Sequence, residues 1–136
     1  MTIVVHIPGE PVAAPRPRAG KHGVYDAKAK LKKEHAELIR QQLPEGHVAW
    51  KGPVSLQLRF AMPIRKSMTK AQKDKAFNGL LYHIKKGDID NYVKHVLDVL
   101  TQAGLWVDDS QVAMLMANKL YRPEPGTAIT AYELPV

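Results

Sequence analysis

Cysteine is absent from the sequence, and this absence excludes several classes of site. The chain can form no disulfide bond, bind no zinc through thiolates and use no thiol nucleophile. Long hydrophobic runs are missing as well, since no apolar stretch approaches the ~18 residues that a membrane-spanning helix needs. The apolar run near Met1 is too short for a signal peptide and follows no basic segment. We therefore expect a cytoplasmic protein that is not attached to a membrane.

Acidic residues are scarce in relation to basic ones. Thirteen Asp and Glu face twenty Lys and Arg, which gives a formal net charge of +7. Such a surplus attracts polyanions, of which nucleic acid is the commonest large one, although basic surfaces also keep proteins soluble. The length of 136 residues and the 45% of hydrophobic residues indicate one globular domain spanning residues 1–136.

Hydrophobic periodicity predicts a domain of the α+β class. It predicts strands at residues 2–7, 54–60, 111–120 and 127–134, and helices at about 27–43, 70–77 and 88–103. We expect the first helix to begin at an Asp26 N-cap, the last to end at Gly104, and the second strand to stop before Pro63. Residues 8–24 hold four prolines and three glycines and are predicted to form an irregular loop.

Four of the thirteen acidic residues lie in two short segments. Asp88 and Asp90 open the last helix, and Asp108 and Asp109 follow its end. Carboxylate oxygens and water are the ligands that Mg²⁺ prefers, and bound Mg²⁺ promotes phosphodiester hydrolysis. Lys94 lies four residues after Asp90 on the same helical face, where an ammonium group can stabilise negative charge on a phosphate. The pattern is typical of a metal-dependent phosphodiesterase site.

Each of these residues also has a simpler interpretation. Asp88 stands where an N-cap is expected, and Asp90 is a first-turn acid that the helix dipole favours. Asp90 and Lys94 fit an ordinary surface ion pair, and the two later aspartates fit a turn. Residue types and spacing leave the structural and the catalytic interpretations open.

The length of the last helix constrains the proposed site. A helix from about 90 to 103 is roughly 20 Å long, whereas the return from Leu105 to Asp109 spans at most about 17 Å. Asp109 therefore approaches Asp90 only if the helix is shorter, the turn is tight, or two subunits share the site. Asp98, four residues beyond Lys94, is expected to take no part, so that Asp98→Asn should stay active.

Three segments together resemble the signature of RusA-type Holliday junction resolvases. They are KKGDIDNYVK at residues 85–94, LDVL at 97–100 and GLWVDDSQV at 104–112. The family pattern has an Asp-x-Asp-Asn helix start, a lysine four residues beyond the second Asp, and a distal Asp-Asp-Ser-Gln-Val. Many members have proline before the first Asp, where this chain has Gly87, which we expect to loosen the approach to the helix.

The resemblance implies a small single domain in which a mixed β-sheet packs against two main helices. It implies Asp88, Asp90 and Asp109 as ligands of Mg²⁺, with Mn²⁺ as a substitute, and Lys94 as a catalytic residue. It also implies a homodimer that binds four-way DNA junctions and resolves them by paired nicks in recombination and repair. Two alternatives stay open: a non-catalytic junction-binding protein, and a related nuclease that acts on flaps or forks.

Other residues are candidates for contacts with DNA. Basic residues near the proposed site or in the proline-rich loop are expected to contact phosphate, namely Arg16, Arg18, Lys21, Lys66, Lys70, Lys85 and Lys86. Trp50, Trp106 and Tyr121 are candidates for stacking on unpaired bases, although Trp106 better fits the core. The histidine spacing does not favour a zinc site, and His83 and His95 are expected to be accessory or solvent-exposed.

Overall fold

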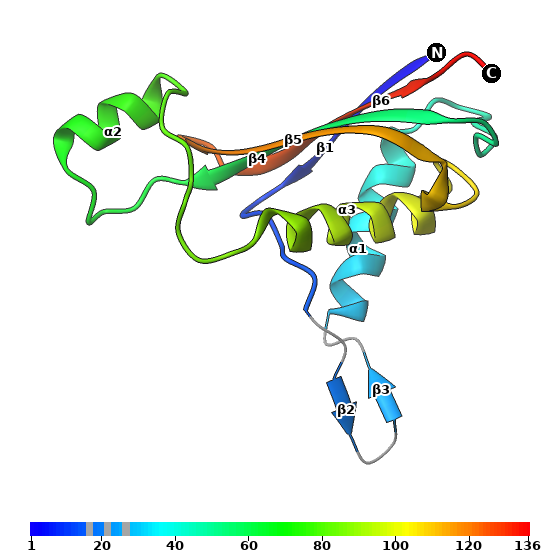
Figure 1. Cartoon of the computed structure of the whole chain (residues 1–136), viewed down its shortest axis with the longest axis horizontal. Helices are drawn as coiled ribbons and strands as arrows, with labels where there is room; N and C mark the ends of the chain where they lie inside the picture. Colours follow the sequence, from blue (N-terminus) through cyan, green and yellow to red (C-terminus); the bar gives the residue numbers. More distant parts are fainter. Residues whose placement is uncertain (16–17, 21–22, 26–27) are drawn as a thin grey trace.

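The computed structural model describes residues 1–15, 18–20, 23–25 and 28–136, and for 18–20 and 23–25 it describes the backbone. The described chain forms one α+β domain with a four-stranded sheet and two helices packed under one of its faces (Figure 1). The sheet strands are β1 (Thr2–Pro8), β4 (Val54–Pro63), β5 (Val112–Arg122) and β6 (Gly126–Glu133). The helices are α1 (Ala29–Gln42), α2 (Lys70–Phe77) and α3 (Ile89–Ala103), followed by a 3₁₀ turn, η1 (Asp109–Gln111).

The sheet is mixed, with the strand order β1-β6-β4-β5. β6 pairs antiparallel with both of its neighbours, and β4 pairs parallel with β5. A parallel pair requires a crossover connection, and here the crossover contains α2 and α3. The crossover therefore brings α3 under the sheet. The acidic motif, which we define as Asp88, Asp90, Asp108 and Asp109, flanks this helix in the sequence.

The core lies between the sheet and the two helices. Alternate residues of β4, from Val54 to Met62, are buried, as expected for a strand with one face on a core. The side chains that meet them from α3 include Val96, Val99 and Leu100, each at most 1% exposed. Because each such side chain contributes about 1.5–3 kcal/mol when fully buried, this contact fixes the position of α3 firmly.

Besides shifts of one or two residues at strand ends, three features differ from those predicted from the sequence. α1 begins at Ala29 with Lys28 in the N-cap position, so the expected Asp26 cap is wrong; Asp26 itself lies outside the described residues. β4 continues through Pro63, which is the last strand residue and needs no further ladder bond. Part of the predicted irregular loop forms a short hairpin of β2 (Arg18–Gly20) and β3 (Gly23–Tyr25).

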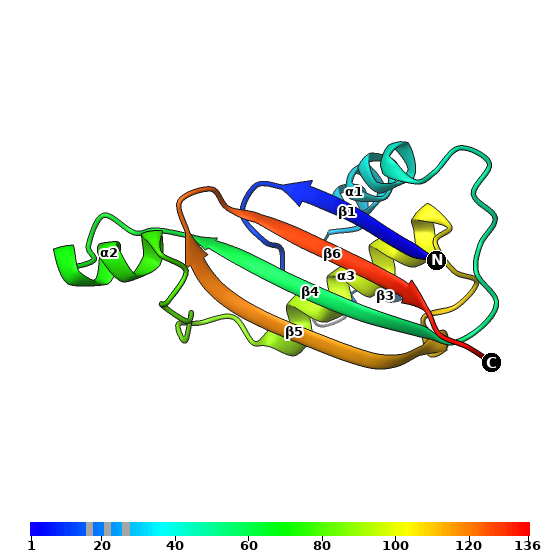
Figure 2. The same ribbon diagram turned by 90° about the horizontal axis from the view of Figure 1, so that it is seen from above.

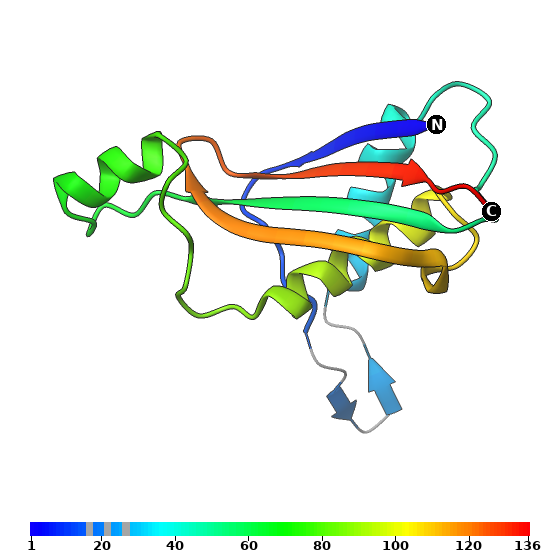
Figure 3. The same cartoon turned by 45° about the horizontal axis from the view of Figure 1, so that its top comes forward.

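The second helix lies apart from the sheet. A capping box begins this helix, because Thr69 Oγ1 accepts from Gln72 N and Gln72 Oε1 accepts from Thr69 N. Figure 3 shows that α2 extends beyond the end of the sheet, so the layer under the sheet consists of α1 and α3. No helix in the described ranges combines the length and apolar character needed to cross a membrane.

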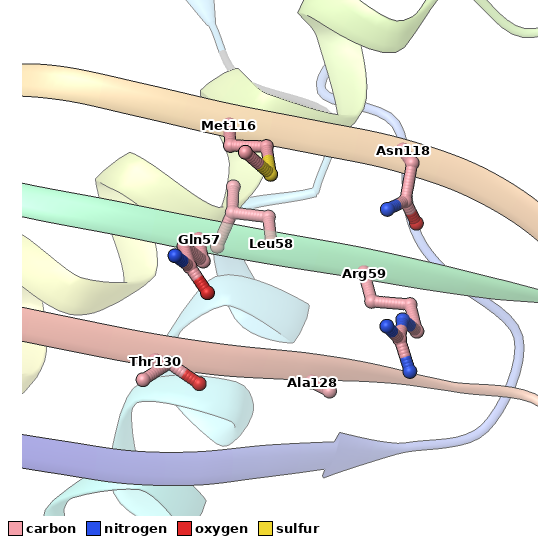
Figure 4. Close-up of a pocket in the computed structure, with 7 residues that line it drawn as sticks. All are labelled: Gln57, Leu58, Arg59, Met116, Asn118, Ala128 and Thr130. Atoms are coloured by element: carbon pink, nitrogen blue, oxygen red, sulfur yellow. The ribbon is translucent and has the colours of Figure 1, made fainter.

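The other face of the sheet is uncovered. Figure 2 shows the four strands side by side with both packed helices behind them. A shallow pocket of about 220 Å³ lies on this open face, where Gln57, Arg59, Met116 and Thr130 surround it (Figure 4). It lies on the face opposite α3 and the acidic motif.

Candidate active site

The Asp88 carboxylate does not cap α3, although Asp88 stands at the start of this helix. Asp88 occupies the N-cap position with an extended backbone (φ −74°, ψ 135°), yet its side chain makes no capping hydrogen bond. Asp90 is exposed in the first turn, and its Oδ1 accepts from Asn91 N at 3.0 Å. The simple capping interpretation therefore does not account for Asp88, and both carboxylates face solvent.

The segment that enters α3 has a hydrogen bond to β5 and packs beside a ring of α3. Gly87 has φ +121°, a conformation that a proline ring forbids and that other residues rarely adopt. Its carbonyl oxygen accepts from Lys119 Nζ at 2.7 Å, and the Tyr92 ring lies directly beside its Cα. The proline that the resemblance leads one to expect here could not adopt this backbone conformation, and the expectation that Gly87 loosens the approach to the helix stays a prediction.

A tight turn follows the C-terminus of α3. Gly104 ends the helix in the left-handed conformation with φ +82°. Trp106 is 1% exposed, and its Nε1 donates to Thr101 Oγ1 at 2.8 Å. Trp50 N donates to Leu105 O at 3.0 Å, which ties this turn to the segment before β4. The turn returns the chain alongside α3.

The two aspartates after this turn have different environments. Asp108 Oδ1 accepts from Ser110 N at 3.1 Å and takes part in a capping box with Gln111 at the start of η1. The Asp109 carboxylate instead lies 4.0 Å from Lys94 Nζ. Asp109 thus returns toward α3 within one chain and reaches the end of the Lys94 side chain, whereas Asp90 lies one turn earlier on the helix.

Lys94 contacts a second carboxylate on its own helix. Asp98 Oδ1 lies 3.0 Å from Lys94 Nζ, and Asp98 Oδ2 lies 2.8 Å from Lys32 Nζ of α1. Burial acts to raise the pKa of Asp98, but the hydrogen bonds from Lys32 and Lys94 outweigh it and hold that pKa below its ordinary value. Asp98 is therefore in contact with the catalytic candidate and is not a neutral control.

The structure brings some of the predicted residues together and leaves others apart. Lys94 joins Asp109 to the middle of α3, whereas Asp88 and Asp90 lie at the helix start. Within the described ranges no three acidic or histidine side chains already surround a metal position. The donor chemistry nevertheless suits Mg²⁺, because the three side chains offer oxygen ligands and those of Asp88 and Asp90 are exposed.

The histidine beside Lys94 is buried and not exposed. His95 is 2% exposed, and its Nε2 lies 3.0 Å from His35 Nδ1 on α1. Burial, assisted by His35 and by Lys32 and Lys28, lowers the pKa of His95 to about 4. His83 is also buried, beside the Tyr121 ring. The expectation of solvent exposure is wrong for both histidines.

The expected stacking residues are part of the core. Trp50, Trp106 and Tyr121 are at most 6% exposed and cannot reach a base. Tyr82 (66%) and Ile84 (88%) are among the exposed apolar side chains in the described part of the chain, and sequence reasoning missed them. The sequence feature that could have identified them is their position just before two lysines and the acidic motif.

Four of the seven basic candidates lie exposed around α2 and before α3, namely Lys66, Lys70, Lys85 and Lys86. The backbone of Arg18 belongs to β2. Arg16 and Lys21 lie outside the described residues.

Comparison with known proteins connects this site to a family. The chain is 40% identical over 134 residues to an uncharacterized protein, YqaN, of Bacillus subtilis strain 168, covering 93% of this chain and 92% of that protein. A family model described as endodeoxyribonuclease RusA matches residues 8–132, which include α3, η1 and the whole acidic motif. The chain therefore belongs to the RusA endodeoxyribonuclease family.

Proposed function

We propose that this protein is a Mg²⁺-dependent endodeoxyribonuclease that resolves four-way DNA junctions by paired nicks, in DNA recombination and repair. The observation that carries the proposal is which carboxylates of the acidic motif act as helix caps and which do not. The carboxylate of Asp88 is not used as a cap, and that of Asp109 lies beside Lys94 while its neighbour Asp108 forms the cap. A purely structural role would have used the Asp88 carboxylate as the cap of α3.

The residues of the site divide the chemical work. Asp88, Asp90 and Asp109 would hold Mg²⁺, or Mn²⁺ in its place. When bound, such an ion polarises the scissile phosphate and activates water for in-line attack. Lys94 brings a positive charge to the same place, where it stabilises the negative charge that develops on the phosphate oxygens.

The DNA-binding surface is the projecting segment between β4 and α3. We define residues 65–86 as the basic arm; it holds seven basic residues and a single acidic one, Asp74. This segment carries nearly all of the net positive charge of the chain. The C-terminal part of the arm is hydrogen-bonded to β5: His83 N donates to Lys119 O, and Tyr121 N donates to Leu81 O. The arm leads directly into Asp88, so DNA bound on its lysines passes the acidic side chains.

The arm also presents apolar side chains to the DNA. Tyr82 and Ile84 are exposed immediately before Lys85 and Lys86. Side chains of this kind bind unpaired or partly unstacked bases, whereas the neighbouring lysines bind phosphates. A crossover, where base stacking is interrupted, offers both kinds of contact at one place. The arm therefore favours a branched substrate over a linear duplex.

The open face of the sheet is the surface we assign to the second subunit of a homodimer. The strand register places Val4, Thr130, Gln57 and Met116 in one row across all four strands. Val4 and Met116 are 68% and 63% exposed, and Met114 on the same edge strand is 59% exposed. Large apolar side chains on an uncovered sheet face and an open strand edge are a liability that a partner removes. Two copies could then present two active sites to the two strands of a junction.

The test is incubation of the protein with an end-labelled four-way junction, with and without Mg²⁺. We expect two symmetric nicks when Mg²⁺ is present and binding without cleavage when it is omitted. Binding that never leads to nicking would favour the non-catalytic junction-binding alternative. Equal cleavage of flaps, forks and junctions in competition would favour the nuclease of broader choice.

A further inference from the structure

A row of alternating charges connects α1 to the candidate active site. Lys32 Nζ lies 2.8 Å from Asp98 Oδ2, Asp98 Oδ1 lies 3.0 Å from Lys94 Nζ, and Lys94 Nζ lies 4.0 Å from Asp109 Oδ2. Each carboxylate oxygen of Asp98 thus binds a different lysine. Asp98 and Lys32 also line, together with Asp108 and Asp109, one pocket of about 330 Å³.

Burial decreases over the first three members of this row, and Asp109 at its end is 36% exposed. The side chain of Lys32 is 9% exposed, that of Asp98 is 21% exposed and that of Lys94 is 58% exposed. A charge as buried as that of Lys32 is costly unless it is paired, so Asp98 is held in place by a partner that has little freedom to move. Lys32 is therefore the most buried member of the row, and Lys94 is the most exposed.

Helix stability alone does not explain the contact between Lys94 and Asp98. An i, i+4 ion pair stabilises a helix better when the acid precedes the base, and here the base precedes the acid. The pair also lies in the middle of α3, away from the helix ends where charges interact with the dipole. The contact with α1 through Lys32 is what distinguishes Asp98 from an ordinary surface acid.

We propose that Asp98, anchored by Lys32, is a positioning residue that holds the Lys94 ammonium group beside Asp109 without letting the two form a close pair. The proposal rests on the proposed function, in which Asp109 binds Mg²⁺ and Lys94 contacts the phosphate. A lysine has a flexible stem, and the nearest other anion for Lys94 is Asp109. If Asp98 were absent, Lys94 would pair with Asp109 and neutralise a carboxylate that the metal needs. Asp98 thereby keeps both partners available.

The first part of the test is a double-mutant cycle on nicking of the four-way junction. Asp98→Asn should lower the maximal nicking rate about 10- to 100-fold, as misplaced catalytic groups do, with little change in junction affinity. In a Lys94→Ala background the same substitution should have no further effect, because Asp98 acts through Lys94. Asp98→Glu should restore part of the rate. Glu133→Gln, which removes an exposed negative charge on β6, is the matched control and should match the wild type.

A second variant protects the test against loss of folding. Asp98→Asn removes one counter-charge of the buried Lys32, so the double substitution Lys32→Met with Asp98→Leu should be made alongside it. Replacement of a buried ion pair by apolar residues of similar size is often neutral for stability. This variant should stay folded by thermal melting and show the same loss of nicking rate as Asp98→Asn.

The third measurement needs no nicking and no metal. Protein with Asp98 and protein with Asp98→Asn are treated with acetic anhydride without DNA, and acetylation of Lys94 is followed by peptide mass spectrometry against the exposed Lys70. Because Lys94 is expected to move to Asp109 when Asp98 is lost, the comparison is made in an Asp109→Asn background, where adding Asp98→Asn should raise the relative acetylation rate of Lys94 about 3-fold or more. If the wild type fails to nick while this rate rises, the proposed function fails and the positioning role stands. Unchanged acetylation, or a rate loss that adds fully to that of Lys94→Ala, would overturn the inference.

Discussion

At the scale of single residues, neighbours in the sequence have separate roles because their side chains have different partners. Asp108 and Asp109 are adjacent, yet the first caps η1 and the second faces Lys94. The acidic pair can be recognised in the sequence. Which of the two caps η1 and which faces Lys94 depends on the turn after Gly104. This difference provides a matched pair of substitutions.

Asp109→Asn should lower the nicking rate at least about 100-fold while leaving junction affinity equal or higher, because a metal ligand and a repulsive charge are both removed. Asp88→Asn and Asp90→Asn should behave in the same way. Asp108→Asn should stay within about 3-fold of the wild type, since asparagine caps as well as aspartate. Single-turnover nicking and filter binding measure both quantities, and an active, folded Asp109→Asn would remove that residue from the metal site.

The environment of His95 predicts a dependence of stability on pH. Its pKa is about 4 in the folded protein and near 6.5 in the unfolded chain, so between these values the unfolded state binds a proton that the native state does not. Neutral His95 therefore favours the folded state fully above pH 6.5, and this stabilisation is lost as the pH falls toward 4. The loss in unfolding free energy reaches about 2–3 kcal/mol at pH 4.5.

Urea unfolding at pH 7.5 and pH 4.5 measures this loss. His95→Gln, which keeps a hydrogen-bonding group for His35 but cannot titrate, should show a smaller loss between the two pH values than the wild type. Equal losses in both proteins would show that other groups account for the acid sensitivity.

At the scale of elements, strongly periodic segments could be predicted from the sequence and long-range pairs could not. The apolar stripe of α3 and the alternation of β4 are local patterns, and both elements lie where these patterns indicated. The ion pair of Lys32 with Asp98 joins residues 66 positions apart, and no local pattern encodes it. Burial of Trp50 likewise depends on its bridge to Trp106, which forms only when the turn after α3 closes.

The two glycines that bound α3 should respond differently to substitution. At Gly104 a new Cβ would meet no atom within 4 Å, so Gly104→Ala should cost about 1 kcal/mol from the left-handed backbone alone. At Gly87 a new Cβ would lie 2.5 Å from the Tyr92 hydroxyl oxygen, so Gly87→Ala should cost more. Urea denaturation gives both free energies of unfolding. Equal costs would mean that the Tyr92 ring moves aside freely.

The basic arm should govern the salt dependence of DNA binding. Each phosphate contact that is lost reduces the slope of log affinity against log salt by about 0.9. The double variant Lys85→Ala and Lys86→Ala should therefore flatten the slope by up to about 2, whereas Lys51→Ala, outside the arm, should leave it unchanged. Fluorescence anisotropy measures the DNA affinity from 50 to 300 mM salt and so gives the slope. Differences of about 1 kcal/mol in binding free energy are easily resolved over this range. An unchanged slope in the double variant would place the DNA elsewhere.

At the scale of the whole molecule, the open sheet face should decide the oligomeric state. Met116→Glu replaces an exposed apolar side chain of the open sheet face by a charge and should convert a dimer to a monomer at micromolar concentration. Val48→Glu, at a position 75% exposed in the loop before β4, is the control and should leave the dimer intact. Sedimentation equilibrium distinguishes the two states. A wild type that is monomeric yet makes paired nicks would contradict the assignment.

The strand order also governs how the chain can fold as it leaves the ribosome. β6 is the last strand to be made, yet it lies between β1 and β4, and Glu133 N donates to Met1 O across the whole length of the chain. At typical rates of synthesis, β1 waits on the order of ten seconds for its partner. Contacts so distant in sequence make folding slow, and until β6 emerges the edges of β1 and β4 stay unpaired. A prematurely ended chain would thus carry every residue of the acidic motif but lack the strand that joins β1 to β4, and it would be prone to aggregate.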